Sequence, residues 1–336
     1  MKQWQIWPGQ PLKQIDVPLP KPGPREVRVR MRAASLNFRD HLLYTGRYPI
    51  TNNGPVVPLS DGAGDVTCVG TGLTSIAVGD RVTATTITNW LDGHFEPQMR
   101  AKSIGFTVPG WLTEEIVLPE TSLVKIPNSM SYDTAATLPC AGVTAWNAVI
   151  ETARIGPGDS VLVQGTGGVS MFAIQLAKTV GAHTIVTSSS DPKLAQACQL
   201  GADKGINYVS NSDWDTTVKT MTGGEGVDLV IENAGTIRQS VLATRWGGLV
   251  AVIGALASFG PSDNLPDTRL PNLLKSGVTI SPIMMGNRRM LTRLVRTYET
   301  HMIVPVINKR FDFREAPEAY DALAAAEHIG KIVITD

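Results

Sequence analysis

The stretch VLVQGTGGVSMFAIQLAK, residues 161–178, combines residue types and spacing that point to phosphate chemistry. An apolar run leads into Gly165, Gly167 and Gly168, and residues 169–180 then repeat apolar side chains at the spacing of one helix face. The free amides and positive dipole end of such a helix favour a bound pyrophosphate, and glycines let the backbone approach it closely. Ser170 replaces the third glycine of the usual fingerprint but is small enough for close helix–strand packing. The alternative is a tight strand-to-helix turn that binds nothing.

The end of the following strand indicates which dinucleotide binds. Proteins that read NAD usually place Asp or Glu there, to accept from the ribose 2′-hydroxyl. This strand instead ends in Ser188 and Ser189, with Lys193 one turn later, and hydroxyls and an ammonium suit a 2′-phosphate. In the alternative, the serines are only a loop and Asp191 takes the acidic role, although we expect Asp191 to N-cap the helix before Pro192. The pattern favours NADP.

Two kinds of pattern must position these residues. Before about residue 125, short alternating runs such as REVRVRMRAAS, separated by Gly-Asp turns, predict an antiparallel, barrel-like β domain. From about residue 139, strands alternate with helices, which predicts an α/β doubly wound parallel sheet with helices on both faces. The strands expected there are SVLVQG, HTIVTSS, GVDLVIENAG, GGLVAVIGA and GVTISPIMM, with helices at 169–180 and DPKLAQACQLG. The tail predicts one more helix, REAPEAYDALAAAEHIG, and a last strand, KIVITD.

Composition limits the function classes. The 336 residues are 43% hydrophobic and 18% charged, which is ordinary for a globular protein of about two domains. Thirty basic and thirty acidic residues cancel without any block of like charge, so nucleic-acid and membrane-surface roles gain no support. The N-terminal MKQWQIWPGQ lacks the apolar region of a signal peptide. Cys68, Cys140 and Cys198 are scattered, as expected of reduced thiols in a cytoplasmic protein.

Several linked motifs resemble the medium-chain dehydrogenase/reductase superfamily, and within it the zinc-free, quinone-oxidoreductase-like branch. They are RAASLNFRD, TGRYP, PLSDGAGDVTCVG, VGDRV, LPCAGVTAWNA, GTGGVS and HIGKIVI, and together they span nearly the whole chain. The resemblance implies a Rossmann NADP-binding domain, residues 128–287, inserted into a mainly-β, GroES-like catalytic barrel formed by residues 1–127 and 288–336, with the cofactor in the cleft. It also implies a homodimer that pairs the last Rossmann strand, GVTISPIMM, across a two-fold axis.

The resemblance also assigns site residues. Carried over position by position, the family's cofactor contacts fall on Asn37, Thr144, Thr166, Gly167, Gly168, Val169, Ser188, Ser189, Lys193, Tyr208, Asn233, Gly254 and Lys331. Tyr208 follows the third strand, where relatives use a tyrosine beside the 2′-phosphate. Lys331 precedes the last strand, where a basic residue is often only a surface residue. Asn37 and Tyr48 are the catalytic candidates: the Asn37 amide donates to the nicotinamide ribose or the substrate oxygen, and Tyr48 matches a tyrosine of enoyl-thioester reductases that donates a proton or holds the substrate.

Several of these residues could have a structural role instead of a functional one. In that case Tyr48 stacks as an aromatic residue of a turn, and Arg39 and Asp40 form an ion pair that orders the loop rather than an acid–base pair. Cys140 is expected to pack behind the nicotinamide as an inert thiol. The aromatic-rich segment 88–115 forms either a substrate lid or a satellite core of the β domain.

The residues at the positions of a metal site predict that zinc is absent. Zinc-dependent relatives place a Cys in the segment matching NFRD and a His-Glu pair in the segment matching LSDGAG, where this chain has Asn37 and Ser60-Asp61. The chain also lacks a cluster of four cysteines, and no His-x-x-His or Cys-x-x-Cys spacing occurs in the sequence.

Without a metal, hydride transfer needs an acceptor that is already electron-poor. Alcohol oxidation normally uses a Lewis acid to make the alkoxide accessible. Quinones, enones, enals and enoyl thioesters instead accept hydride at carbon while charge develops on oxygen, which hydrogen-bond donors in a dry cleft stabilise. We therefore expect an NADPH-dependent, zinc-independent reductase of quinones or α,β-unsaturated carbonyl compounds. The alternatives are a zinc-independent alcohol dehydrogenase and a non-catalytic dinucleotide-binding structural or sensor protein.

Overall fold

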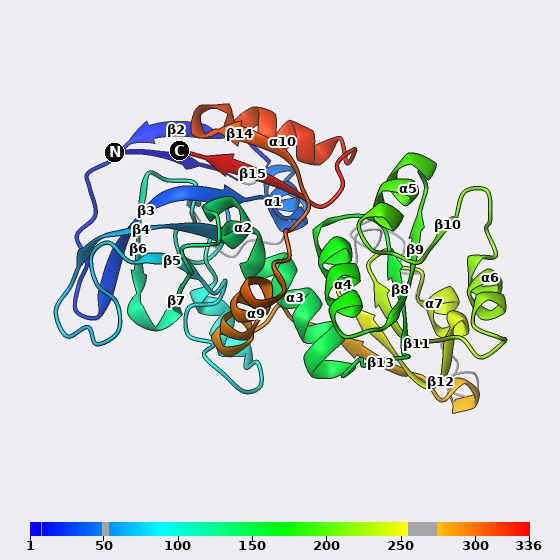
Figure 1. Ribbon diagram of the computed structural model, residues 1–336. Coiled ribbons are helices and arrows are strands. Elements are labelled where there is room, and N and C mark those ends of the chain that lie inside the picture. The colour runs from blue at the N-terminus through cyan, green and yellow to red at the C-terminus, as the bar shows by residue number, and fades with distance from the viewer. Residues whose placement is uncertain (8, 49–53, 255–273) are drawn as a thin grey trace. The chain divides into compact units, whose positions relative to one another are not determined.

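The chain forms two compact units. The computed structural model describes residues 1–7, 9–48, 54–254 and 274–336. Unit 1 comprises Met1–Val143 and Met285–Asp336, and unit 2 comprises Thr144–Met284 (Figure 1). The boundaries expected from the sequence were 127/128 and 287/288. The first one differs because Arg81 donates to the carbonyls of Pro127 and Met130, and Ser35 Oγ donates to the carbonyl of Ala136. These bonds tie the residues after 127 to unit 1.

Unit 1 is mainly antiparallel β-sheet, as expected. Its strands are β1 (Lys2–Gln5), β2 (Lys13–Asp16), β3 (Glu26–Ser35), β4 (Asp61–Val69), β5 (Arg81–Ala84), β6 (Glu115–Pro119), β7 (Leu123–Lys125), β14 (Ile307–Asp312) and β15 (Lys331–Thr335). The large sheet runs β14-β15-β3-β4-β5-β7, and β6 also pairs with β3. β14 and β15 are parallel to each other, while the pairs from β15 to β7 are antiparallel. The last strand of the chain therefore lies beside a strand near its beginning.

Alternation in the sequence explains the central strand β3. Val27, Val29 and Met31 point to one face and are buried, whereas the arginines between them point to the other face. The buried side chains join one core with Trp111 and Ile332, so the N-terminal part and the tail share a single apolar interior.

The helices of unit 1 are short, apart from α9. They are α1 (Phe38–Tyr44), α2 (Tyr132–Thr137), α9 (Arg288–His301) and α10 (Ala316–Ala324), with 3₁₀ turns at Pro97–Lys102, Glu120–Ser122 and Phe313–Glu315 and a π-helical turn at Leu138–Gly142. In α9, Leu291, Leu294, Val295 and Tyr298 are buried at the spacing of one helix face. Asn287 caps this helix by accepting from the N–H of Met290.

Unit 2 is a parallel sheet with helices between its strands. The strands are β8 (Ser160–Gln164), β9 (His183–Ser188), β10 (Lys204–Asn207), β11 (Val227–Glu232), β12 (Thr244–Val252) and β13 (Thr279–Pro282). The helical elements are α3 (Val143–Trp146), a π-helical turn at Asn147–Thr152, α4 (Gly168–Thr179), α5 (Asp191–Gln199), α6 (Trp214–Met221) and α7 (Ile237–Ala243).

The strand order of unit 2 is β10-β9-β8-β11-β12-β13, and every pair is parallel. In chain order this is 3-2-1-4-5-6, the order of a doubly wound Rossmann fold. Because the order reverses at β8 and such crossovers are right-handed, the helices on either side of the reversal cover opposite faces of the sheet. The α/β fold expected from the sequence is therefore confirmed. Within the expected domain 128–287, residues 255–273 lie outside the described residues.

Candidate functional site

The glycine turn of unit 2 lies between β8 and α4. Gly165 has a φ of 72°, in the left-handed region that favours glycine. Gly167 is the N-cap of α4 and has ordinary extended backbone. A Cβ added at either glycine would meet no atom of the described residues within 4 Å beyond its chain neighbours. Protein packing therefore gives no reason for a glycine at 167, whereas a ligand held by the free amides of α4 does. The turn fits a pyrophosphate.

A hydrogen-bond network behind the turn fixes its shape. Ser170 Oγ donates to the carbonyl oxygen of Gln164 at 2.8 Å, and Asn233 Nδ2 donates to Ser170 Oγ at 3.2 Å. The backbone N–H groups of Asn233 and Ala234 donate to Gln164 Oε1 at 3.2 and 3.1 Å. Ser170 thus does more than allow close packing, because it joins the end of β8 to the loop that carries Asn233.

Glu232 organises the same loop and was not predicted. Its buried carboxylate accepts from the backbone N–H groups of Ala234, Gly235 and Thr236 at 2.9, 2.7 and 3.2 Å. It also accepts from Gln164 Nε2 at 3.0 Å. The sequence signal was a carboxylate at the end of an otherwise apolar strand, VDLVIE.

Ser188 and Tyr208 meet where β9 and β10 end. The backbone N–H of Tyr208 donates to the carbonyl of Ser188 at 3.1 Å. The Tyr208 side chain is exposed, whereas Ser188 is buried, with its Oγ accepting from the N–H of Ser190 at 3.3 Å. The two residues predicted to contact a 2′-phosphate are therefore neighbours through their backbones.

The predicted N-cap role of Asp191 is wrong. Ser190 is the N-cap of α5, with extended backbone and an Oγ that accepts from the N–H of Lys193. Asp191 is the first residue of the helix, and its carboxylate accepts from Asn207 Nδ2 at 2.7 Å. A serine satisfies an N-cap as well as an aspartate does, so Ser190 takes the cap one residue earlier.

The other expected contacts of unit 2 lie at one edge of its sheet, because parallel strands end on the same side. They are Thr166, Gly167, Gly168 and Val169 after β8, Ser189 and Lys193 after β9, Asn233 after β11 and Gly254 after β12. Thr144 is buried in α3, which has a π-helical turn on each side. Such turns are frequent at functional sites.

Asn37, Asp61 and Lys331 come together in unit 1. Asn37 follows β3, and Asp61 and Lys331 begin β4 and β15, the two neighbours of β3. Lys331 Nζ donates to Asn37 Oδ1 at 2.6 Å and to the carbonyl of Leu36 at 2.5 Å, and it lies 3.9 Å from Asp61 Oδ2. Lys331 is 3% exposed, so the surface-residue alternative is wrong.

Asp61 is surrounded by donors. Ser60 Oγ donates to Asp61 Oδ1 at 2.7 Å, the backbone N–H of Cys140 donates to Oδ2 at 3.2 Å, and Asn37 Nδ2 lies 3.5 Å from Ser60 Oγ. Burial raises the pKa of Asp61, and the Lys331 ammonium offsets part of the rise. Burial, with a further contribution from Asp61, raises the pKa of the Cys140 thiol to about 12. That thiol stays protonated at neutral pH, in keeping with the inert role expected of it.

The ion pair expected between Arg39 and Asp40 does not occur among the salt bridges of the described residues. The backbone N–H of Asn37 donates to Asp40 Oδ2 at 2.8 Å at the start of α1. The Arg39 guanidinium instead donates to Ser103 Oγ and the carbonyl of Ile104, each at 3.2 Å, and so ties α1 to the segment 88–115. Asp40 is fully buried, which raises its pKa to about 6 although Arg39 and the Asn37 N–H lower it.

The segment 88–115 supports the backbone next to Asp61. Leu59 has a φ of 71°, which is unusual for a residue with a Cβ. The N–H of Trp111 donates to the Leu59 carbonyl at 2.8 Å, and a Cβ on Gly105 would lie only 2.6 Å from the Leu59 carbonyl carbon. The closeness of these three backbones holds the strained residue in place.

The aromatic residues of segment 88–115 differ in their surroundings, which bears on whether the segment is a substrate lid or a satellite core of the β domain. Trp90 and Trp111 are buried, and the carbonyl of Trp90 accepts from the N–H of Arg288 at the start of α9, as in a satellite core. Phe106 is half-buried and packs edge-on against Tyr48, with ring centroids 5.2 Å apart. Tyr48 is thus held by an aromatic partner.

The donor set around Asn37 does not fit a catalytic zinc ion. Zinc takes thiolate, imidazole or carboxylate ligands, whereas Asn37 Oδ1 and Asp61 Oδ2 already face the Lys331 ammonium, whose positive charge would repel a divalent cation. Ser60 Oγ donates its proton to Asp61. Within the described ranges, no three His, Cys, Asp or Glu side chains are grouped so as to hold a metal ion.

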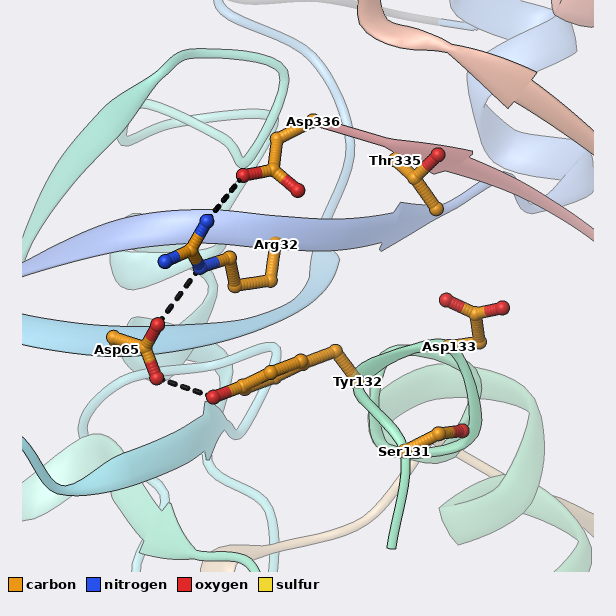
Figure 2. Close-up of a pocket in the computed structure, with 7 residues that line it drawn as sticks. All are labelled: Arg32, Asp65, Ser131, Tyr132, Asp133, Thr335 and Asp336. Atoms are coloured by element: carbon orange, nitrogen blue, oxygen red, sulfur yellow. Dashed lines mark hydrogen bonds and ion pairs between the residues drawn. The ribbon is translucent and has the colours of Figure 1, made fainter.

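A hollow of about 510 Å³ in unit 1 is lined by Arg32 of β3, Asp65 of β4, Thr335 at the end of β15 and residues at the start of α2 (Figure 2). Arg32 lies between Asp65 and Asp336, with N–O distances of 2.7 and 2.6 Å, and Tyr132 points its hydroxyl at Asp65. These carboxylates raise the pKa of Arg32. Asp133 pairs with Arg310 at 2.6 Å, so the charged groups of this hollow are satisfied by the protein itself.

Comparisons with known proteins match both units. A protein-family model described as a zinc-binding dehydrogenase matches residues 168–300, and a family model described as an alcohol dehydrogenase GroES-like domain matches residues 23–128. The chain is 40% identical over 318 residues to a zinc-type alcohol dehydrogenase-like protein of Schizosaccharomyces pombe, covering 94% of this chain and 92% of that protein. It is 32% identical over 330 residues to a quinone oxidoreductase of Pseudomonas aeruginosa, again covering 94% and 92%.

A solved NAD-dependent alcohol dehydrogenase superposes with a TM-score of 0.89 at 32% identity, covering 100% of both chains. Unit 1 therefore has the GroES-like fold and unit 2 the Rossmann fold that the motifs imply. In the part of the chain that the structure describes, no helix has both the length and the apolar character needed to cross a membrane.

Proposed function

Because the chain belongs to the medium-chain dehydrogenase/reductase superfamily of oxidoreductases, we propose that it reduces quinones or α,β-unsaturated carbonyl compounds with NADPH and without zinc. Conjugated ketones, conjugated aldehydes and enoyl thioesters are the carbonyl compounds meant. The observation that carries the proposal is the contact between the Lys331 ammonium and Asn37 Oδ1, which are 2.6 Å apart. Asn37 stands at the position where zinc-dependent relatives have a metal ligand.

Residues of unit 2 are proposed to hold the dinucleotide. The amides of the glycine turn and of the α4 N-terminus bind its pyrophosphate, and Ser188, Ser189 and Lys193 bind a 2′-phosphate. The remaining proposed contacts are Thr144, Thr166, Val169, Tyr208, Asn233 and Gly254. When bound, the dihydronicotinamide supplies a hydride.

The choice of NADPH over NADH rests on the end of β9. The NAD dependence of the solved relative favours the opposite choice for this chain. Against it, Asp191 already accepts a hydrogen bond from Asn207, so the nearest carboxylate after the three serines is engaged by the protein. The hydroxyls of Ser188 and Ser189 and the ammonium of Lys193 are donor types that suit a phosphate.

Asn37 and Tyr48 are the proposed donors to the substrate. An electron-poor acceptor develops negative charge on oxygen as hydride adds to carbon, and one positioned donor stabilises such charge by about 2.7–4 kcal/mol. The Asn37 amide supplies an N–H, and the Tyr48 hydroxyl supplies a hydrogen bond or the proton. The buried Lys331 places a fixed positive charge beside Asn37, so this class of acceptor needs no further cation.

A panel of acceptors tests the proposal. Purified protein is given NADPH or NADH with a quinone, a conjugated ketone and a saturated ketone, and NADP⁺ with a primary alcohol. We expect NADPH oxidation with the quinone or the conjugated ketone, and a kcat/KM for NADPH at least about tenfold above that for NADH, the worth of one charge-assisted hydrogen bond. Turnover confined to the alcohol and the saturated ketone would contradict the proposed substrate class.

Two other functions compete. The names of the relatives favour an alcohol dehydrogenase, and robust alcohol oxidation by chelator-treated protein would support that function without zinc. The second is a dinucleotide-binding structural or sensor protein. Tight NADPH binding with no turnover across the panel would support it.

We also propose a cytoplasmic homodimer. Among the described strands β13 ends the sheet order of unit 2, which leaves an edge for pairing with a second copy, and the three cysteines are free thiols. Light scattering with size exclusion measures the mass in solution. A catalytic domain of residues 1–127 and 288–336 and an NADP-binding domain of residues 128–287 belong to the same proposal.

A further inference from the structure

Three neighbouring strands deliver the groups around Asn37. Ser35 pairs with both Asp61 of β4 and Val333 of β15, on the two sides of β3. Continuing the antiparallel register of β3 and β15 by two residues places Lys331 opposite Asn37. The contact between Asn37 and Lys331 is therefore fixed by strand pairing, not by flexible side chains meeting in a loop.

The contacts on its two sides determine which way the Asn37 amide points. An ammonium can only donate, so Lys331 must face the amide oxygen, and the structure has Nζ 2.6 Å from Oδ1. On the other side of the amide, Ser60 Oγ lies 3.5 Å from Asn37 Nδ2 and gives its own proton to Asp61, so the serine presents an accepting lone pair to the amide nitrogen. An isolated asparagine can rotate its amide by half a turn, but here that rotation would turn the NH₂ group towards the Lys331 ammonium and set donor against donor.

One hydrogen of the fixed amide remains for a ligand. Among the described residues, Nδ2 donates to Ser60 Oγ at 3.5 Å, and this long contact takes only one of the two hydrogens on the amide nitrogen. Asn37 is half-buried, whereas Lys331 and Asp61 are 3% and 0% exposed. Of Asn37, Lys331 and Asp61, only the asparagine is exposed enough to contact a ligand. The two charged side chains are buried next to it.

We propose that Lys331 and Asp61 are positioning residues that act through Asn37, fixing its amide so that one N–H is presented to the carbonyl oxygen of a conjugated acceptor. The ammonium on Oδ1 also polarises the amide and strengthens its N–H as a donor. This role rests on the proposed reductase function. It replaces direct contact of Lys331 with the dinucleotide, which is the role that the resemblance gives it.

The test removes both charges together. Losing one member of a buried ion pair leaves the other uncompensated and destabilises the fold, whereas replacing both is far better tolerated. The variants are Asn37→Ala, the double variant Lys331→Met/Asp61→Asn and the triple variant that combines them. Lys309→Met, an exposed lysine of β14, is the matched control, and circular dichroism with thermal unfolding checks the fold of each.

For the double variant we expect kcat with a conjugated ketone to fall by about 10- to 100-fold, a fraction of the loss seen when an oxyanion donor is removed. The dissociation constant of NADPH should stay within about threefold of the wild-type value, because the proposed role does not involve the dinucleotide. The triple variant should be no slower than Asn37→Ala alone, since the charges act through the asparagine. The proposal would be overturned if the fall in kcat of the triple variant equalled the product of the falls in the double variant and in Asn37→Ala. A large loss of NADPH affinity in the double variant would overturn it as well.

A second readout does not depend on turnover. Perdeuterated protein labelled with ¹⁵N only at asparagine shows side-chain NH₂ signals, and that of Asn37 is the one missing from Asn37→Ala. We expect its hydrogen exchange to be at least about tenfold faster in the double variant than in wild type and in Lys309→Met, because the amide loses the Lys331 ammonium and the Asp61 carboxylate that orients Ser60. Equal exchange in all three proteins would overturn the positioning role. If wild type reduced no conjugated acceptor, the proposed function would fail, and this measurement would still decide whether the charges fix the amide.

Discussion

Replacing Asp40 with asparagine should change how the stability of the protein depends on pH. Asp40 is fully buried in α1, and burial raises its pKa to about 6. The groups that act on it are Arg39 and Lys331, which lower the pKa, and Asp61, which raises it, and Asp40 in turn raises the pKa of the buried Tyr320. Within the described structure Asp40 Oδ1 has no hydrogen-bond partner, so nothing stabilises a charge on that oxygen directly.

The size of the effect follows from the shift. The ordinary pKa of an Asp side chain is 3.8, so the folded protein keeps this proton to a pH about two units higher than the unfolded chain does. At about 1.4 kcal/mol per unit, the protonated carboxyl favours the folded state by about 3 kcal/mol below pH 4. That contribution is lost as the pH rises through 6, and about 1.4 kcal/mol of it disappears between pH 5 and pH 8. An asparagine keeps an oxygen for the N–H of Asn37 but has no proton to lose.

The measurement is urea unfolding of wild type and Asp40→Asn between pH 5 and pH 8, with the exposed Asp16→Asn as control. The difference in free energy of unfolding, Asp40→Asn minus wild type, should grow by about 1.4 kcal/mol in favour of the variant over this range. The control should follow the wild type. Parallel curves for Asp40→Asn and wild type would refute the reasoning, because the carboxyl would then ionise as it does in the unfolded chain.

Three further substitutions have direct outcomes. Lys193→Ala should reduce the preference for NADPH over NADH by about tenfold in fluorescence titrations, because a charge-assisted bond to the 2′-phosphate is lost; equal affinities in wild type would refute this. Gly167→Ala should weaken dinucleotide binding by at least about tenfold with little change in melting temperature, since its Cβ meets no described protein atom within 4 Å and would stand where the pyrophosphate is proposed; unchanged binding would contradict the pyrophosphate site. Gly62→Ala should destabilise unit 1 by about 2 kcal/mol or more in urea, because its Cβ would lie 2.2 Å from the Trp111 ring, whereas Gly54→Ala, whose Cβ meets no atom of the described residues within 4 Å, should be mild. Equal effects of these two alanines would count against the packing described.

Local patterns were sufficient to predict the fold and the glycine turn between β8 and α4. The apolar run, the glycines and the helix stripe of residues 161–178 are neighbours in sequence, and strand ends on one side of a parallel sheet follow from the βα alternation. The strand order of unit 2 then places the residues after β8, β9 and β11 at one edge without any further information.

Contacts that depend on the register of strand pairing could not be predicted from the sequence alone. Asn37 and Lys331 are separated by 294 residues, and only the pairing of β3 with β15 brings them together. For the same reason Lys331 was open to interpretation as a surface residue. Competing local options caused the error at Asp191, because Ser190 offers the same kind of N-cap oxygen one residue earlier.

The central claim is that reduction of a conjugated acceptor by this chain needs no divalent ion. The direct measurement is the rate of NADPH oxidation with a conjugated ketone before and after exhaustive dialysis against a chelator, with the metal content of both samples determined by mass spectrometry. We expect substoichiometric metal in both samples and rates of NADPH oxidation before and after dialysis that agree within about twofold. The reason is that side-chain donors, rather than a Lewis acid, stabilise the charge on the substrate carbonyl oxygen. A stoichiometric divalent ion whose removal abolishes turnover and whose return restores it would contradict the account.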